Sequence, residues 1–71
     1  MNREQHLKLA DTAVTRAERL AGDAERYATH PDYPHKVAPL AAAGALWADI
    51  ARTHAAIAAA MPETSDTKPE A

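Results

Sequence analysis

The histidines are the side chains of this sequence with the clearest capacity for chemistry. His30, Asp32 and His35 lie close together, and with His54 they would form a set of imidazole and carboxylate ligands suited to zinc. His30 and His35 each stand beside a proline, and the spacing matches no metal motif with a known mechanism. We therefore predict exposed histidines with no metal and no cofactor, and leave metal binding by His30, His35 and His54 as an open alternative.

Nucleophilic catalysis has no candidate residues. The chain has no cysteine, and its single serine, Ser65, is not paired with a base. His54 and the nearest acid, Asp49, fall on different faces of a helix. We predict that the protein is not an enzyme and that His54 is an interface histidine, able in a dimer to bond its symmetry mate. Asp49 and Arg52 should form a local ion pair. For Trp47 we favour a role in the core over a role as a platform on which a ligand stacks.

The stretch from Pro39 to Met61 must position most of these side chains. It carries eleven of the nineteen alanines and only two charged residues. Its larger side chains recur at alternating steps of three and four, which is typical of a helix packed along a seam. Small residues such as Gly44 should let a facing backbone approach closely. The predicted interface residues are Leu40, Ala43, Gly44, Trp47, Ile50, His54, Ile57 and Met61.

A first helix is predicted over about residues 3–29. Asn2 can cap it, with Gln5 reaching back as in a capping box. Its apolar positions form one broad stripe of mostly alanine, and its opposite face carries charged pairs three or four residues apart.

Three prolines, Pro31, Pro34 and the directly following Pro39, indicate a turn over residues 30–38. Asp32 is the best cap for the helix that follows. The second helix is predicted over about 39–61. A start near residue 33 with a kink at Pro39 is the favoured alternative. Residues 62–71 lack large apolar side chains, which predicts a disordered acidic tail.

The predicted fold class is all-α, an antiparallel helical hairpin over residues 1–61. Two such helices cannot close a core, because the second is apolar on nearly every side and would leave Leu46, Trp47 or Ile50 facing water. We therefore expect a homo-oligomer, in the simplest case a dimer that forms a four-helix bundle.

The charge pattern narrows the range of partners. The net charge is -2 and lies in the tail, so the folded part is neutral and we expect no nucleic-acid partner. Asp49 and Arg52 would lie at mid-depth in a bilayer, so we expect no membrane span. The lack of cysteine and of a signal-peptide pattern predicts a cytoplasmic protein.

The run His30-Pro31-Asp32-Tyr33-Pro34, then an alanine-rich helix and Thr53-His54-Ala55-Ala56-Ile57-Ala58, resembles short alanine-rich two-helix hypothetical proteins of actinobacteria and their phages. The resemblance covers about half of the chain. It implies a helical hairpin in a bacterial or phage cytoplasmic setting, and no activity.

The function predicted from these features is a non-enzymatic, self-associating helical protein-interaction module. A first alternative is a phage- or host-encoded inhibitor or accessory factor that binds a protein partner. A second is a small metal- or ligand-binding helical bundle.

Overall fold

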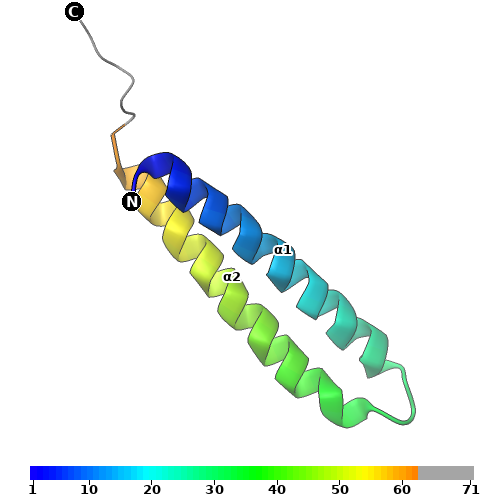
Figure 1. Ribbon diagram of the computed structural model, residues 1–71. Helices are drawn as coiled ribbons and strands as arrows, with labels where there is room; N and C mark the ends of the chain where they lie inside the picture. The colour runs from blue at the N-terminus through cyan, green and yellow to red at the C-terminus, as the bar shows by residue number, and fades with distance from the viewer. Residues whose placement is uncertain (63–71) are drawn as a thin grey trace, which may run out of the picture.

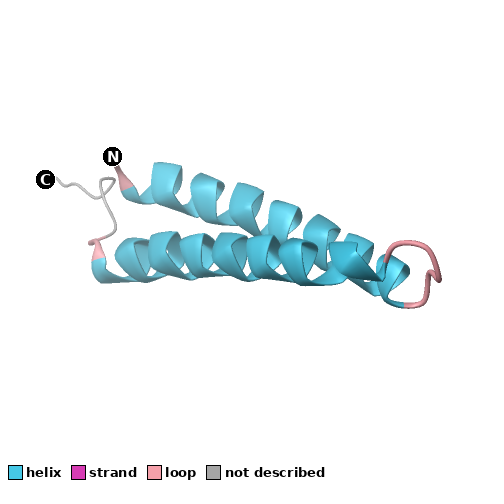
Figure 2. Ribbon diagram, turned by 90° about the horizontal axis from the view of Figure 1, so that it is seen from below, coloured by secondary structure: helices cyan, strands magenta, loops and turns pink. Residues whose placement is uncertain are grey.

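The structure, a computed structural model, describes residues 1–62 as two long helices lying side by side in opposite directions (Figures 1 and 2). Helix α1 spans Arg3–Ala28, a short 3-10 helix η1 spans Pro34–Lys36, and helix α2 spans Val37–Ala60. The all-α class and the hairpin are confirmed over these residues. Of the tail predicted over residues 62–71, all but Pro62 lies outside the described part. Within that part, no helix is both long enough and apolar enough to cross a bilayer.

Helix α1 begins with the predicted capping box. The Asn2 side chain accepts a hydrogen bond from the Gln5 backbone N–H at 2.8 Å, and the Gln5 side chain accepts one from the Asn2 N–H at 2.8 Å. These bonds satisfy donors that a helix start otherwise leaves unpaired. The helix ends before Pro31, because a proline pushes the preceding residue away from helical geometry.

The start of α2 differs from the prediction. A single 3-10 turn leads into the helix, which begins at Val37, neither near residue 33 nor at Pro39. Pro39 is therefore the third helical residue, where the backbone N–H has no intrahelical partner in any helix, so its missing donor costs no hydrogen bond. The prediction that Asp32 caps α2 is wrong. Lys36 is the cap residue, and the Asp32 backbone N–H donates to His30 Nδ1 at 3.0 Å.

The contact between the two helices is built from small residues. Ala10, Ala13 and Ala24 of α1 and Gly44, Ala51 and Ala58 of α2 are buried. No large side chain among residues 1–62 is fully buried. Because alanine ends at Cβ, the helix backbones approach closely, and a Cβ built on Gly44 would lie 3.5 Å from Leu20 Cβ. The hairpin thus has a thin core.

Aromatic residues close the turn. The rings of Tyr27 and Tyr33, on either side of the turn, meet edge to face, with centroids 5.7 Å apart. The Lys36 ammonium lies 5.2 Å from the Tyr27 centroid and 4.7 Å from the Tyr33 centroid. These cation–π contacts join the end of α1 to the start of α2.

Candidate self-association surface

One line of α2 residues faces α1, and we call it the inner seam. Three contacts fix its position: Gly44 beside Leu20, His54 against His6, and Ala58, whose carbonyl accepts a hydrogen bond from Arg3 Nε at 3.2 Å. The other members follow by steps of three and four. The inner seam consists of Val37, Leu40, Gly44, Trp47, Ala51, His54, Ala58 and Met61.

A second line of α2 residues, the outer seam, lies one residue earlier at each step. One residue corresponds to a rotation of about 100° around the helix, so this line points to the side of the hairpin. The outer seam consists of Ala43, Leu46, Ile50, Thr53, Ile57 and Ala60. None of these residues is buried, and Leu46 is 62% exposed and Ile57 39% exposed.

The structure divides the predicted interface residues between the two seams. Five of them belong to the inner seam, namely Leu40, Gly44, Trp47, His54 and Met61, and contribute to the hairpin itself. The other three, Ala43, Ile50 and Ile57, belong to the outer seam. The sequence pattern joined the two sets because the large side chains of both follow one three-and-four spacing, and the buried Ala51 and Ala58 were missed.

His54 has a partner within the same chain. Its Nδ1 lies 2.9 Å from Nδ1 of His6 on α1, whereas the sequence suggested a bond to its symmetry mate. Sequence reasoning missed His6. The turn near residue 31 could have indicated the pair, because antiparallel helices joined there place His6 and His54 at nearly the same level.

The histidines proposed as alternative zinc ligands are not brought together. His30 and His35 lie at the turn around Tyr33, with ring centroids 4.7 and 6.2 Å from the tyrosine ring, while His54 pairs with His6 near the start of α1. Over residues 1–62, no group of three His, Cys, Asp or Glu side chains is placed to hold a metal ion.

The polar side chains of α2 are engaged locally. Arg52 forms an ion pair with Asp49, as predicted, and both side chains are exposed. Trp47 is half-buried, and the Arg16 guanidinium lies over its ring, 4.7 Å from the centroid. Neither Asp49 nor Arg52 belongs to the outer seam, so this line carries no charge.

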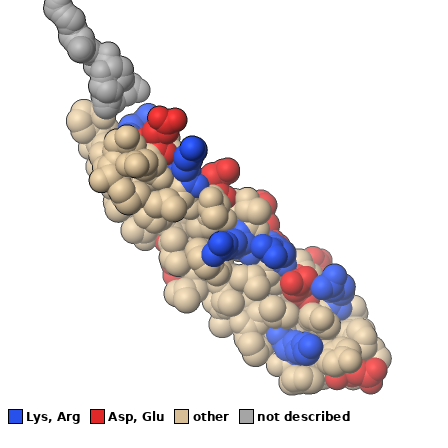
Figure 3. Space-filling view, in the orientation of Figure 1, with Lys and Arg blue, Asp and Glu red and all other residues tan. Residues whose placement is uncertain are grey.

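The surface over α1 differs from the surface over α2. In Figure 3 the charged side chains gather mostly over α1, and the neighbouring surface over α2 is largely uncharged. Asp23 and Arg26 of α1 form an exposed ion pair at 2.7 Å. Three apolar residues of α1 are nevertheless 41 to 42% exposed: Leu7, Leu9 and Val14. Exposed large apolar side chains thus occur on both helices, and on α2 they are Leu46 and Ile57.

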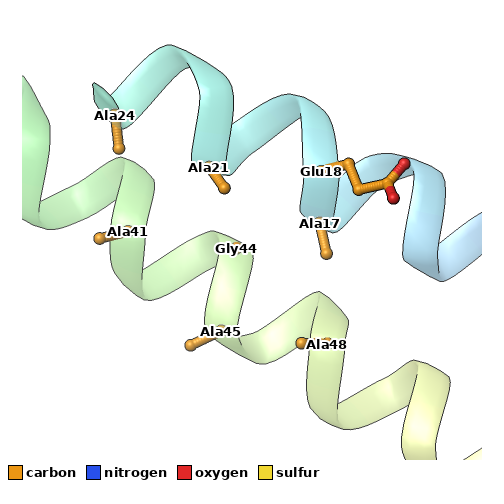
Figure 4. Close-up of a pocket in the computed structure, with 8 residues that line it drawn as sticks. All are labelled: Ala17, Glu18, Ala21, Ala24, Ala41, Gly44, Ala45 and Ala48. Carbon is orange, nitrogen blue, oxygen red and sulfur yellow. The ribbon is translucent and has the colours of Figure 1, made fainter. Parts of the chain in front are cut away.

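A shallow groove of about 500 Å³ runs between the helices on one side (Figure 4). Glu18 contributes its only charged side chain. The other lining residues are small: Ala17, Ala21, Ala24, Ala41, Gly44, Ala45 and Ala48. The groove exists because these side chains end at Cβ and leave the space between the backbones open, and we call it the alanine groove.

Comparisons of the chain with protein-family models, with curated proteins and with solved structures found no match. The function is therefore inferred from the geometry of the described residues.

Proposed function

We propose that the protein is a non-enzymatic, self-associating helical module in which two hairpins pack through their α2 helices as a four-helix bundle. The observation that carries this proposal is the outer seam. Leu46 is 62% exposed, Ile57 is 39% exposed and Ile50 is half-buried, in a line without any charged residue.

The energetics favour covering this seam. Full burial of a Leu or Ile side chain contributes roughly 1.5–3 kcal/mol, whereas each alanine methyl of the hairpin contact contributes only about 0.8 kcal/mol. Small domains are stable by about 5–15 kcal/mol in total. A second copy that covers the remaining exposed surface of Leu46, Ile50 and Ile57 on both chains therefore adds burial comparable to part of the stability of a small domain.

The direct test is the oligomeric state of the wild-type protein. Sedimentation equilibrium should give a mass near twice the chain mass of 7.6 kDa, and Tm should rise with protein concentration. A monomer whose Tm is independent of concentration would overturn the proposal. If that monomer instead formed a stoichiometric complex with a protein from its own cell, the accessory-factor alternative would replace self-association.

Charged substitutions locate the contact. Ile50→Asp should dissociate the dimer and lower Tm, because an unpaired carboxylate cannot be buried without a large cost. Ala45→Asp is the matched control: it adds the same charge to the same helix at an exposed residue of the alanine groove. A dimer that resists Ile50→Asp and dissociates with Ala45→Asp would place the contact in that groove.

A further inference from the structure

We infer that the second copy docks antiparallel along the outer seam of α2, with a two-fold axis that passes α2 between Ala51 and Arg52. This inference rests on the proposed self-association and specifies its geometry.

The order of residues along the outer seam is symmetric about its midpoint. Leu46 and Ile57 are equally far from the point between Ala51 and Arg52, and so are Ile50 and Thr53. Ala43 and Ala60 form the outermost pair. When two such helices run in opposite directions, Leu46 of each copy meets Ile57 of the other copy. Alanine meets alanine at both ends.

The angle between the seams decides between antiparallel and parallel docking. The inner and outer seams are about 100° apart around α2, close to the right angle between neighbouring contacts in a square bundle. A two-fold axis perpendicular to the α2 pair leaves both α1 helices on the same side of it, which closes a four-helix bundle. A parallel pair would place the α1 helices on opposite sides and leave the bundle open.

Leu9 supplies a further contact in this arrangement. It is 41% exposed and directly precedes the buried Ala10, so it lies on the side of α1 that turns toward the outer seam. The His6–His54 contact places Leu9 at about the level of Ala51, because each is three residues from its histidine along antiparallel helices. The two-fold axis passes at this level, and Leu9 therefore faces Leu9 of the second copy.

Cysteine cross-linking tests the direction and register, because the sequence contains no cysteine of its own. Chains carrying Leu46→Cys and labelled with ¹⁵N are mixed with unlabelled Ile57→Cys chains, unfolded, refolded together and oxidised gently. Mass spectrometry then separates mixed from same-variant disulfides. We expect almost only mixed disulfides. Predominantly same-variant pairs would show a parallel dimer, and same-variant pairs as frequent as mixed ones would show unspecific contact; either result overturns the inference.

A milder pair of variants guards against loss of folding. Ala43→Cys and Ala60→Cys should also give mixed disulfides, and circular dichroism checks that each variant stays helical. Wild-type protein that sediments as a dimer while neither pair cross-links would overturn the antiparallel register and leave the proposed self-association standing. A wild-type monomer would overturn both.

Discussion

The Nδ1 atom of His6 on α1 lies 2.9 Å from the Nδ1 atom of His54 on α2. The ring centroids are 5.2 Å apart, so the two rings present these nitrogens to each other. A hydrogen bond of this kind needs one imidazole with a proton on Nδ1 and one without, because a doubly protonated imidazolium only donates. Both side chains are half-buried, and the contact joins two residues that are far apart in sequence.

Removing one imidazole should weaken the hairpin. His54→Ala leaves His6 half-buried without its hydrogen-bond partner, so we expect the free energy of unfolding to fall by about 1 kcal/mol. Urea denaturation followed by circular dichroism measures the change.

His54→Gln provides the control, because glutamine can still hydrogen-bond His6. This variant should keep much of the stability that His54→Ala loses. Equal urea midpoints for the two variants would contradict a stabilising hydrogen bond between His6 and His54.

Two glycines offer a matched pair of stabilising substitutions. Gly22 has open space where a Cβ would lie, and a Cβ on Gly44 would meet Leu20 and Ala21 at ordinary contact distances of 3.5 and 3.7 Å. Alanine favours a helix interior over glycine by about 0.5–1 kcal/mol. Gly22→Ala and Gly44→Ala should therefore both raise the urea midpoint, by similar amounts. A loss of stability with Gly44→Ala alone would show that the inner seam has no room for a methyl group.

The tight helix contact predicts the opposite result for a large side chain. Ala58 is 1% exposed on the inner seam, and its neighbour Ala59 is exposed. Ala58→Leu should destabilise the protein by about 1–3 kcal/mol, because added methylene groups must separate the helices. Ala59→Leu should change stability by less than about 0.5 kcal/mol, as is usual for surface sites. Similar urea midpoints for the two variants would contradict the close approach of α1 and α2.

Local rules predicted much of this fold. The capping box of Asn2 and Gln5 and the ion pair of Asp49 with Arg52 each depend on residues three positions apart. Such features follow from spacing and side-chain chemistry alone. The cap at Asp32 failed because the chain forms a 3-10 turn from Pro34 before α2 begins.

The face that α2 turns toward α1 was harder to predict. Pattern reading gives weight to large side chains such as Trp47 and Ile50, whereas the buried positions hold Gly44, Ala51 and Ala58. Alanine occurs on every side of this helix, so hydrophobicity alone provides little contrast between its faces. The exposed outer seam became distinguishable only when the contacts of Gly44 and His54 had fixed the orientation.

An alanine side chain has no rotamers, and a row of Cβ methyl groups presents nearly the same shape after the helix slides by two turns. The inner seam therefore holds α1 and α2 close without strongly specifying their alignment along the axis. Alignment must come from groups that occur once: the His6–His54 pair near one end of the hairpin and the ring and ammonium contacts of Tyr33 and Lys36 at the other. The contacts at these two ends therefore fix how far each helix can shift along the other.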